Sequence, residues 1–375
     1  MLKYCFTFLL SAFACCGLNA QCPPGDVILS SQAEVDAFVA DYPDCTEIAG
    51  SMLIGSLSDP TDITDISGLS NLTSIGGNLD LLDNDSISSL AGLELLVSID
   101  GDLNIKSNAI LTSLSGFNQL TSINGVFSII GNTHLMSLSG LEQLTFIGGD
   151  LLISGNPDLT NLTGFDQLNS IHGDLEISGN PNLTSLTGLI QLTLIGGDLY
   201  IRFNSVLTSL TELEQLTSIG GFLVISGNTE LMSLAGLKNL DATTIDNLFM
   251  SSNYQLSSCA IESICNYLSL ETNSANISGN ATGCATREEV ETACMVSATE
   301  ISQANIKLFP NPTNGMLQLR NITAKEVVVY TAQGQRIARY DNPGQELDLS
   351  ALPAGVYHLH LITADAVHAA RVVKQ

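Results

Sequence analysis

The middle of the chain repeats itself every 24 residues, and this repeat constrains the fold more than any other feature. An apolar pair lies five and three residues before each recurring asparagine, for example Leu151 and Ile153 before Asn156. The recurring asparagines are Asn84, Asn108, Asn132, Asn156, Asn180, Asn204, Asn228 and, after one interval of 25, Asn253. A unit this short cannot enclose a hydrophobic core alone, so the units are predicted to stack.

The spacing within one unit indicates short strands. Its apolar positions come in alternating pairs separated by turns, which leaves no room for a full helix. Stacked units place equivalent residues about 4.8 Å apart, so that each column becomes a ladder on a parallel sheet. The sequence therefore predicts a mainly β chain whose middle is a parallel β-solenoid, right-handed because parallel connections usually are. We expect the asparagine amides to point inward and to satisfy backbone groups of their own and adjacent coils.

The segments around the repeat differ in character. Residues 1–20 carry an early lysine, an apolar stretch and a small final residue, as a secretory signal peptide does. Cys15 and Cys16 leave a lipoprotein as the alternative, although the residues before them make a poor lipobox. Elsewhere no segment has the roughly 18 uninterrupted apolar residues of a membrane helix. The expected divisions are 1–20 signal peptide, 21–45 N-terminal cap, 46–258 solenoid, 259–294 disulfide-rich C-terminal cap, 295–305 linker and 306–375 a small β-sandwich domain.

Six cysteines remain after the expected signal peptide, and none lies inside the repeat. An even number in an exported chain predicts disulfides, and the alternative, a zinc site, has no CxxC pair to support it. Cys22 and Cys45 bracket a predicted helix with a Ser31–Glu34 capping box and are expected to pair. The other four, Cys259, Cys265, Cys284 and Cys294, allow three connectivities, among which the sequence does not choose.

Charge separates the tail from the solenoid. The whole chain has 12 basic and 38 acidic residues, for a formal net charge of −26. Residues 46–258 have 3 basic and 22 acidic residues (3 − 22 = −19), whereas residues 301–375 have 7 and 5 (7 − 5 = +2). This balance argues against nucleic acid as a partner, because phosphates require a basic surface.

The LxIxxN core of the repeat resembles that of leucine-rich repeats. Together with the segment from Cys45 to Gly50 that enters the first coil, it looks like the receptor L domain, the β-solenoid of insulin and epidermal growth factor receptors. The resemblance covers about residues 46–258 and implies a fold more than an activity. The first coil departs from the pattern, because Leu57 stands where an asparagine is expected.

The last 70 or so residues resemble the C-terminal sorting domain of the type IX secretion system. Alternating apolar residues such as Val327 and Val329 predict a compact sandwich of strands. The residues that carry the resemblance are Pro310, Asn311, Pro312, Gly315, Gly355, Tyr357 and Lys374. The resemblance implies a partner, the type IX machinery, and export through the periplasm to the outer surface of a Gram-negative bacterium, followed by attachment or release.

The sequence offers little for catalysis. His134 and His172 occupy different columns of different coils, and no phosphate-binding loop, nucleophile elbow or HExxH motif is present. We therefore expect no enzyme and no cofactor. Asp150, Asp174 and Asp198 share a column on consecutive coils, which makes Ca²⁺ a weak candidate ligand; the bland interpretation is that each aspartate caps its own turn.

A binding face would use the outward positions of the strands. Most coils place small polar residues there, but one reads Leu199-Tyr200-Ile201-Arg202-Phe203. Aromatic residues and arginine dominate contact sites, although neutral drift on a tolerant surface would give the same residues. The candidate face consists of Lys106, Glu176, Tyr200, Arg202 and Phe203.

These features predict an exported, non-enzymatic binding or adhesion protein, secreted or at the cell surface, whose ligand is an unidentified protein or glycan. One alternative is a structural spacer without a specific ligand. Another is an ice-binding protein, suggested by a threonine column that Met136 and Met232 interrupt: Thr112, Thr160, Thr184 and Thr208.

Overall fold

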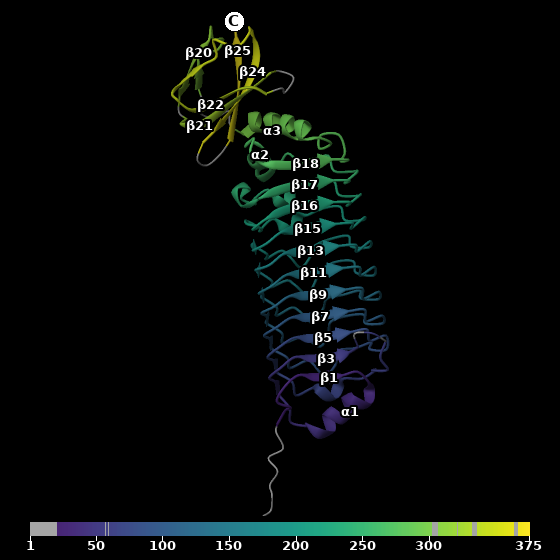
Figure 1. Ribbon diagram of the computed structural model, residues 1–375. Helices are drawn as coiled ribbons and strands as arrows, with labels where there is room; N and C mark the ends of the chain where they lie inside the picture. The colour runs from purple at the N-terminus through teal and green to yellow at the C-terminus, as the bar shows by residue number, and fades with distance from the viewer. Residues whose placement is uncertain are drawn as a thin grey trace, which may run out of the picture.

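A long parallel sheet forms one wall of the solenoid. The computed structural model describes residues 21–56, 58, 60–301, 307–320, 322–331, 336–363 and 367–375, so the expected signal peptide and Leu57 lie outside the described chain. Eleven strands follow one another along the rod in sequence order (Figure 1). They are β1 (Val27–Leu29), β3 (Met52–Gly55), β5 (Leu79–Leu82), β7 (Leu103–Lys106), β9 (Phe127–Ile130), β11 (Leu151–Ser154), β13 (Leu175–Ser178), β15 (Leu199–Arg202), β16 (Phe222–Ser226), β17 (Asn247–Ser251) and β18 (Ser274–Ser278).

A second, narrower parallel sheet forms another wall. Its seven strands have two residues each: β2 (Glu47–Ile48), β4 (Ser74–Ile75), β6 (Ser98–Ile99), β8 (Ser122–Ile123), β10 (Phe146–Ile147), β12 (Ser170–Ile171) and β14 (Leu194–Ile195). Short 3-10 turns complete some coils: η1 (Ser67–Leu69), η2 (Thr211–Leu213), η3 (Ala235–Leu237) and η4 (Ala242–Thr244).

The core is a stack of apolar columns. Strands β11 and β13 pair in register, with Leu151 opposite Leu175 and Ile153 opposite Ile177, one repeat apart. All four side chains are fully buried. The predicted solenoid of 24-residue coils is therefore confirmed, because each apolar column of the sequence is a column of the core.

The asparagine column bridges neighbouring coils inside this core. The Asn132 amide Nδ2 donates to the Ile105 carbonyl at 2.9 Å, and the Asn156 Oδ1 accepts from the Asn132 backbone N–H at 3.0 Å. The same pattern repeats along the column, whose eight members are between 0 and 2% exposed. Asn280, in the region expected to be only a cap, continues the column by accepting from the Asn253 backbone N–H.

The N-terminal cap covers the first coil with a strand and a helix. Strand β1 pairs with β3, and α1 (Gln32–Asp41) begins after Ser31, whose side chain accepts from the Glu34 N–H. A disulfide joins Cys22 to Cys45. The long sheet thus starts at β1, before residue 46. The sequence alone had predicted that the first coil begins at residue 46.

The C-terminal cap contains α2 (Glu262–Leu268), strand β18 and α3 (Arg287–Ile301). Disulfides join Cys259 to Cys284 and Cys265 to Cys294, which selects one of the three connectivities left open. Two expected boundaries shift. Strand β18 pairs with β17 and adds a coil beyond residue 258, and α3 continues into the stretch 295–305 expected to be a linker.

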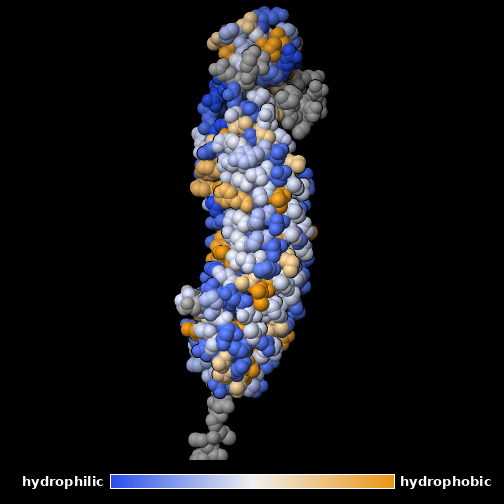
Figure 2. Space-filling model, turned by 90° about the vertical axis from the view of Figure 1, so that its right-hand side faces the viewer, coloured by the Kyte–Doolittle hydropathy of each residue, from blue (hydrophilic) through white to orange (hydrophobic). Residues whose placement is uncertain are grey.

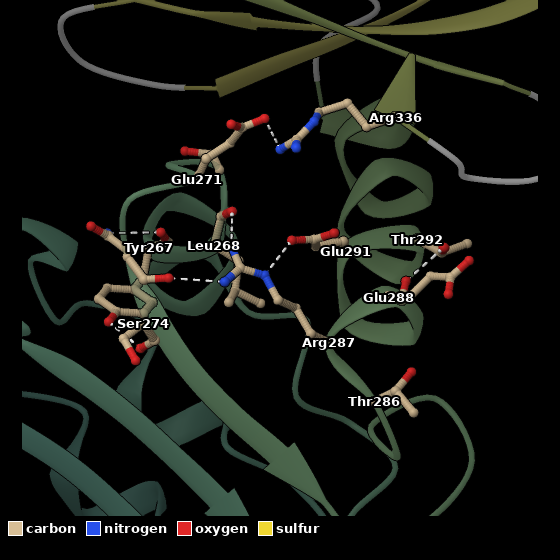
Figure 3. Close-up of polar contacts among 12 residues, drawn as sticks. Tyr267, Leu268, Glu271, Ser274, Thr286, Arg287, Glu288, Glu291, Thr292 and Arg336 are labelled. Atoms are coloured by element: carbon tan, nitrogen blue, oxygen red, sulfur yellow. Dashed lines mark hydrogen bonds and ion pairs between the residues drawn. The ribbon is translucent and has the colours of Figure 1, made fainter. Parts of the chain in front are cut away.

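Arg287 connects the parts of this cap (Figure 3). Its guanidinium pairs with Glu291 at 2.7 Å on α3 and donates to the carbonyls of Asn273 and Leu268. Beside it, an ion pair between Arg336 and Glu271 links the tail domain to the cap.

The tail forms two antiparallel sheets around one small core. The first has β19 (Lys307–Phe309), β20 (Met316–Arg320) and β23 (Glu346–Asp348); the second has β22 (Arg336–Gly344), β21 (Ala324–Thr331), β24 (Gly355–Ile362) and β25 (Val367–Lys374). Leu317 and Leu347 of the first sheet share a core with Val327 and Leu359 of the second. This tail domain lies beyond α3, at the end of the rod opposite α1 (Figure 1). Among the described helices, none is long and apolar enough to cross a membrane.

We expect Asn156→Leu to lower the free energy of unfolding by about 2–5 kcal/mol, because it leaves the Asn132 N–H and the Ile129 carbonyl buried without their partners. Chemical denaturation followed by circular dichroism measures the change. The exposed Asn182→Leu is the control and should stay within about 0.5 kcal/mol of the parent. Equal stability of the two variants would contradict a structural role for the column.

Candidate functional site

The outer face of the long sheet has three columns of side chains, because alternate residues of each strand point away from the core. The middle column runs through Glu176, Tyr200, Val224 and Phe249, which are partners in successive strand pairs. On other coils this column holds Leu53, Asp80, Asn104, Ser128 and Leu152. The aromatic residues of the column therefore lie on the last coils of the solenoid.

Arg202 and Tyr200 form one contact group with Glu176. The Arg202 guanidinium pairs with Glu176 Oε1 at 2.7 Å and lies over the Tyr200 ring, 4.7 Å from its centre. Both partners of the ion pair are partly exposed, so screening by water limits its contribution to stability. The group is better understood as a fixed arrangement of an aromatic ring and a cation on the surface.

The Tyr200 hydroxyl donates to Oδ2 of Asp198, two residues earlier in the chain. That hydrogen bond, together with burial and the negative charge of Asp198, raises the pKa of Tyr200 from its usual value of 10 to about 12. Tyr200 therefore remains neutral throughout the physiological range, with its hydroxyl bound to Asp198 and the Arg202 guanidinium over its ring.

Phe203 is strained and exposed. Its φ is +56°, in the left-handed region, at a position where five other coils have glycine. A bulky residue there costs on the order of 1 kcal/mol. The side chain is 63% exposed, and its ring lies so close to Gly227 that a Cβ at Gly227 would come within 2.6 Å of Cδ1. The strained backbone at residue 203 thus places a phenyl ring in solvent.

Lys106 does not belong to this group. It lies on β7, and β9 and β11 separate that strand from β13, which carries Glu176. At about 4.8 Å per strand the separation exceeds 14 Å. The structure therefore brings together four of the five candidate residues, Glu176, Tyr200, Arg202 and Phe203.

Two aromatic residues of the same face were not predicted from the sequence. Phe222 and Phe249 lie on β16 and β17 with ring centres 6.1 Å apart, and Phe222 is 38% exposed. Their outward positions follow from the strand register, but the 25-residue interval before Asn253 obscures that of Phe249. A register count from the apolar pair Leu248 and Met250 would have found it.

The aspartate column caps the neighbouring coil. Asp150 Oδ1 accepts from the Asp174 N–H, Asp174 Oδ1 from the Asp198 N–H, and Asp198 Oδ1 from the Phe222 N–H, each at 2.7–2.8 Å. Burial is the main cause that raises the pKa of Asp174, and the charges of Asp150 and Asp198 add to it. In the described part of the chain no three His, Cys, Asp or Glu side chains are placed to hold a metal ion. Each aspartate thus caps the turn of the next coil, whereas the sequence suggested that each aspartate caps the turn of its own coil.

The sorting-domain residues meet at one end of the tail. The Asn311 amide donates to the Arg371 carbonyl at 2.8 Å and its Oδ1 accepts from the Val373 N–H at 2.9 Å, which holds β25. Tyr357 Oη donates to the Pro353 carbonyl, and Lys374 Nζ donates to the Leu352 carbonyl. Gly315 has a φ of +139°, where a side chain would contact Ser350. Pro310 and Pro312 flank Asn311, and Gly355 begins β24.

Tyr200 should ionise near pH 12, and Asp198→Asn should lower this pKa towards 10, because the hydrogen bond to Asp198 is the largest cause of the shift. An ultraviolet difference titration against Tyr200→Phe isolates this residue. Since the folded-state pKa is raised, the stability that it contributes is present below pH 10 and is lost as the pH passes 12. An unchanged titration in Asp198→Asn would contradict the contact.

Comparison with known proteins bears on the tail alone. Residues 307–375 match the family model of the secretion system C-terminal sorting domain. No curated protein matched the chain. The match identifies the tail as a sorting domain of the type IX secretion system, and supports a protein that is secreted or attached to the outer cell surface.

Proposed function

We propose that the solenoid is a non-enzymatic binding module that the sorting domain delivers to the cell exterior. It would hold a protein or glycan ligand on the outer face of the long sheet, near its last coils. The regular coils support this proposal, because the strand register holds the outer side chains of neighbouring coils in fixed positions. From Leu79 to Ser226 the described coils keep one 24-residue interval and leave no inserted loop in which catalytic groups would converge.

One observation carries the proposal: a strained, exposed Phe203 next to the Tyr200–Arg202 contact. Strained residues persist where function compensates for their cost. Aromatic side chains and arginine are the residues that most often dominate binding energy. Figure 2 shows one side of the rod, where polar and neutral residues predominate and apolar residues occur singly or in small groups.

Ice binding receives no support from the threonine column. Met136 and Met232 are 54% and 53% exposed and interrupt it. The Thr184 hydroxyl donates to the Thr160 carbonyl of the preceding coil at 3.1 Å. A flat, regular array of free hydroxyls is thus absent from this column.

The double variant Tyr200→Ala, Phe203→Gly should abolish binding on protein and glycan arrays, or reduce it at least tenfold. Glycine relieves the left-handed strain at residue 203, so that change should not destabilise the coil. Leu82→Ala, on the outer face of distant β5, is the matched control and should bind as the parent does. If the double variant bound as well as the parent, the proposal that the ligand binds on this face would be refuted. If the parent itself bound nothing, the spacer alternative would replace the proposal.

Deletion of residues 306–375 should leave the protein in the periplasm, because the sorting domain is the part that the type IX machinery recognises. Cell fractionation and surface labelling measure the location. Arg336→Ala, which removes only the ion pair to Glu271, should be exported normally. Surface display of the truncated chain would contradict the assignment.

A further inference from the structure

The geometry points to a partner of defined chemistry: we propose that the outer face binds a protein segment that is basic at one end and apolar at the other. The inference rests on the proposed binding function and names its ligand class. The surface concerned is here called the acidic-aromatic strip. It consists of one column, Asp150, Asp174, Asp198 and Phe222, and of the adjoining column from Leu152 and Glu176 to Tyr200, Val224 and Phe249. Glu176 neutralises Arg202, which lies over the Tyr200 ring, so the aspartates remain the net charge of the strip.

The acidic half of the strip concentrates negative charge. Its three aspartates come from consecutive coils, so their carboxylates repeat at about 4.8 Å. The capping hydrogen bonds engage only Oδ1 of Asp150 and Asp174, and among the described residues no donor reaches their Oδ2 atoms. Lysine or arginine side chains of a partner would satisfy those oxygens and relieve the repulsion.

The aromatic half follows directly along the same columns. Tyr200 pairs with Val224, and Val224 with Phe249, while Phe222 continues the aspartate column. Burial of such side chains by a partner is the main favourable term at contact sites. The Phe222 and Phe249 rings are tilted by 55° to each other. A tilted pair suits inserted apolar side chains better than the flat face of a sugar ring, which favours protein over neutral glycan.

The charge of the whole solenoid agrees with a basic partner. Residues 46–258 have a net charge of −19, which attracts cationic groups and repels nucleic acid, acidic glycans and a second copy of the chain. The strip runs from β11 to β17, four strand intervals or about 19 Å. That length accommodates a short extended peptide with basic residues over β11–β15 and apolar residues over β15–β17.

The test is a titration of the full mature chain with a short synthetic peptide that has lysines in its first half and leucines and phenylalanines in its second. Asp174→Asn keeps an Oδ1 acceptor for the Asp198 N–H but removes the charge, and Phe249→Ser removes a ring. We expect each change to weaken binding about tenfold, and Asp174→Asn also to reduce the salt dependence. Asp102→Asn and Leu82→Ser, outside the strip, should bind as the parent does.

The outcomes separate this inference from the proposed function. Peptide binding that the two strip variants weaken and the two controls preserve supports it. Equal binding by a peptide with glutamate in place of lysine, or by both strip variants, overturns it. A third outcome is that the peptide fails to bind while an array ligand binds the parent but not the double variant Tyr200→Ala, Phe203→Gly. In that case the inference is wrong and the proposed binding function is supported. If neither peptide nor any array ligand binds, both fall.

Discussion

The solenoid depends on a buried hydrogen-bond pattern that repeats from coil to coil. Each asparagine amide from Asn132 to Asn253 donates to a strand carbonyl of the preceding coil, and its oxygen accepts from the asparagine N–H of that coil. A turn buried in an apolar interior would otherwise leave backbone groups unpaired at a cost of about 1–3 kcal/mol each. The column therefore sets the register in which leucine and isoleucine columns stack. The rigid outer face on which the aromatic residues gather is a consequence of that register.

The periodic part of this architecture could be predicted because it repeats. The 24-residue interval of asparagines such as Asn132 and Asn156 was sufficient to define the columns, the inward amides and the parallel sheet. The ends were harder to predict, because caps have no repeat. Asn280 lies 27 residues after Asn253, so the last coil was hidden by its altered interval. The pairing of Cys259 with Cys284 was likewise not predictable, since spacing alone does not select a connectivity.

The candidate site was predictable only in part. Tyr200, Arg202 and Phe203 stood out because they break a consensus within one strand and its turn. Their surroundings could not be predicted from the sequence. These are the ion pair between Arg202 and Glu176, the hydrogen bond from Tyr200 to Asp198, and the alignment of Phe249 two strands away. These depend on inter-coil register and side-chain direction. The left-handed backbone at Phe203 has a signal in the sequence, because Gly131, Gly155, Gly179 and Gly227 occupy the same position of other coils.

Hydrogen exchange of the asparagine side-chain amides, followed by nuclear magnetic resonance, tests the central claim most directly. The eight amides from Asn84 to Asn253 are buried and hydrogen-bonded, so we predict that they exchange far more slowly than the exposed amide of Asn182. Rapid exchange of the amides on the central coils, at the rate of Asn182, would show that they are in contact with water and would contradict the account.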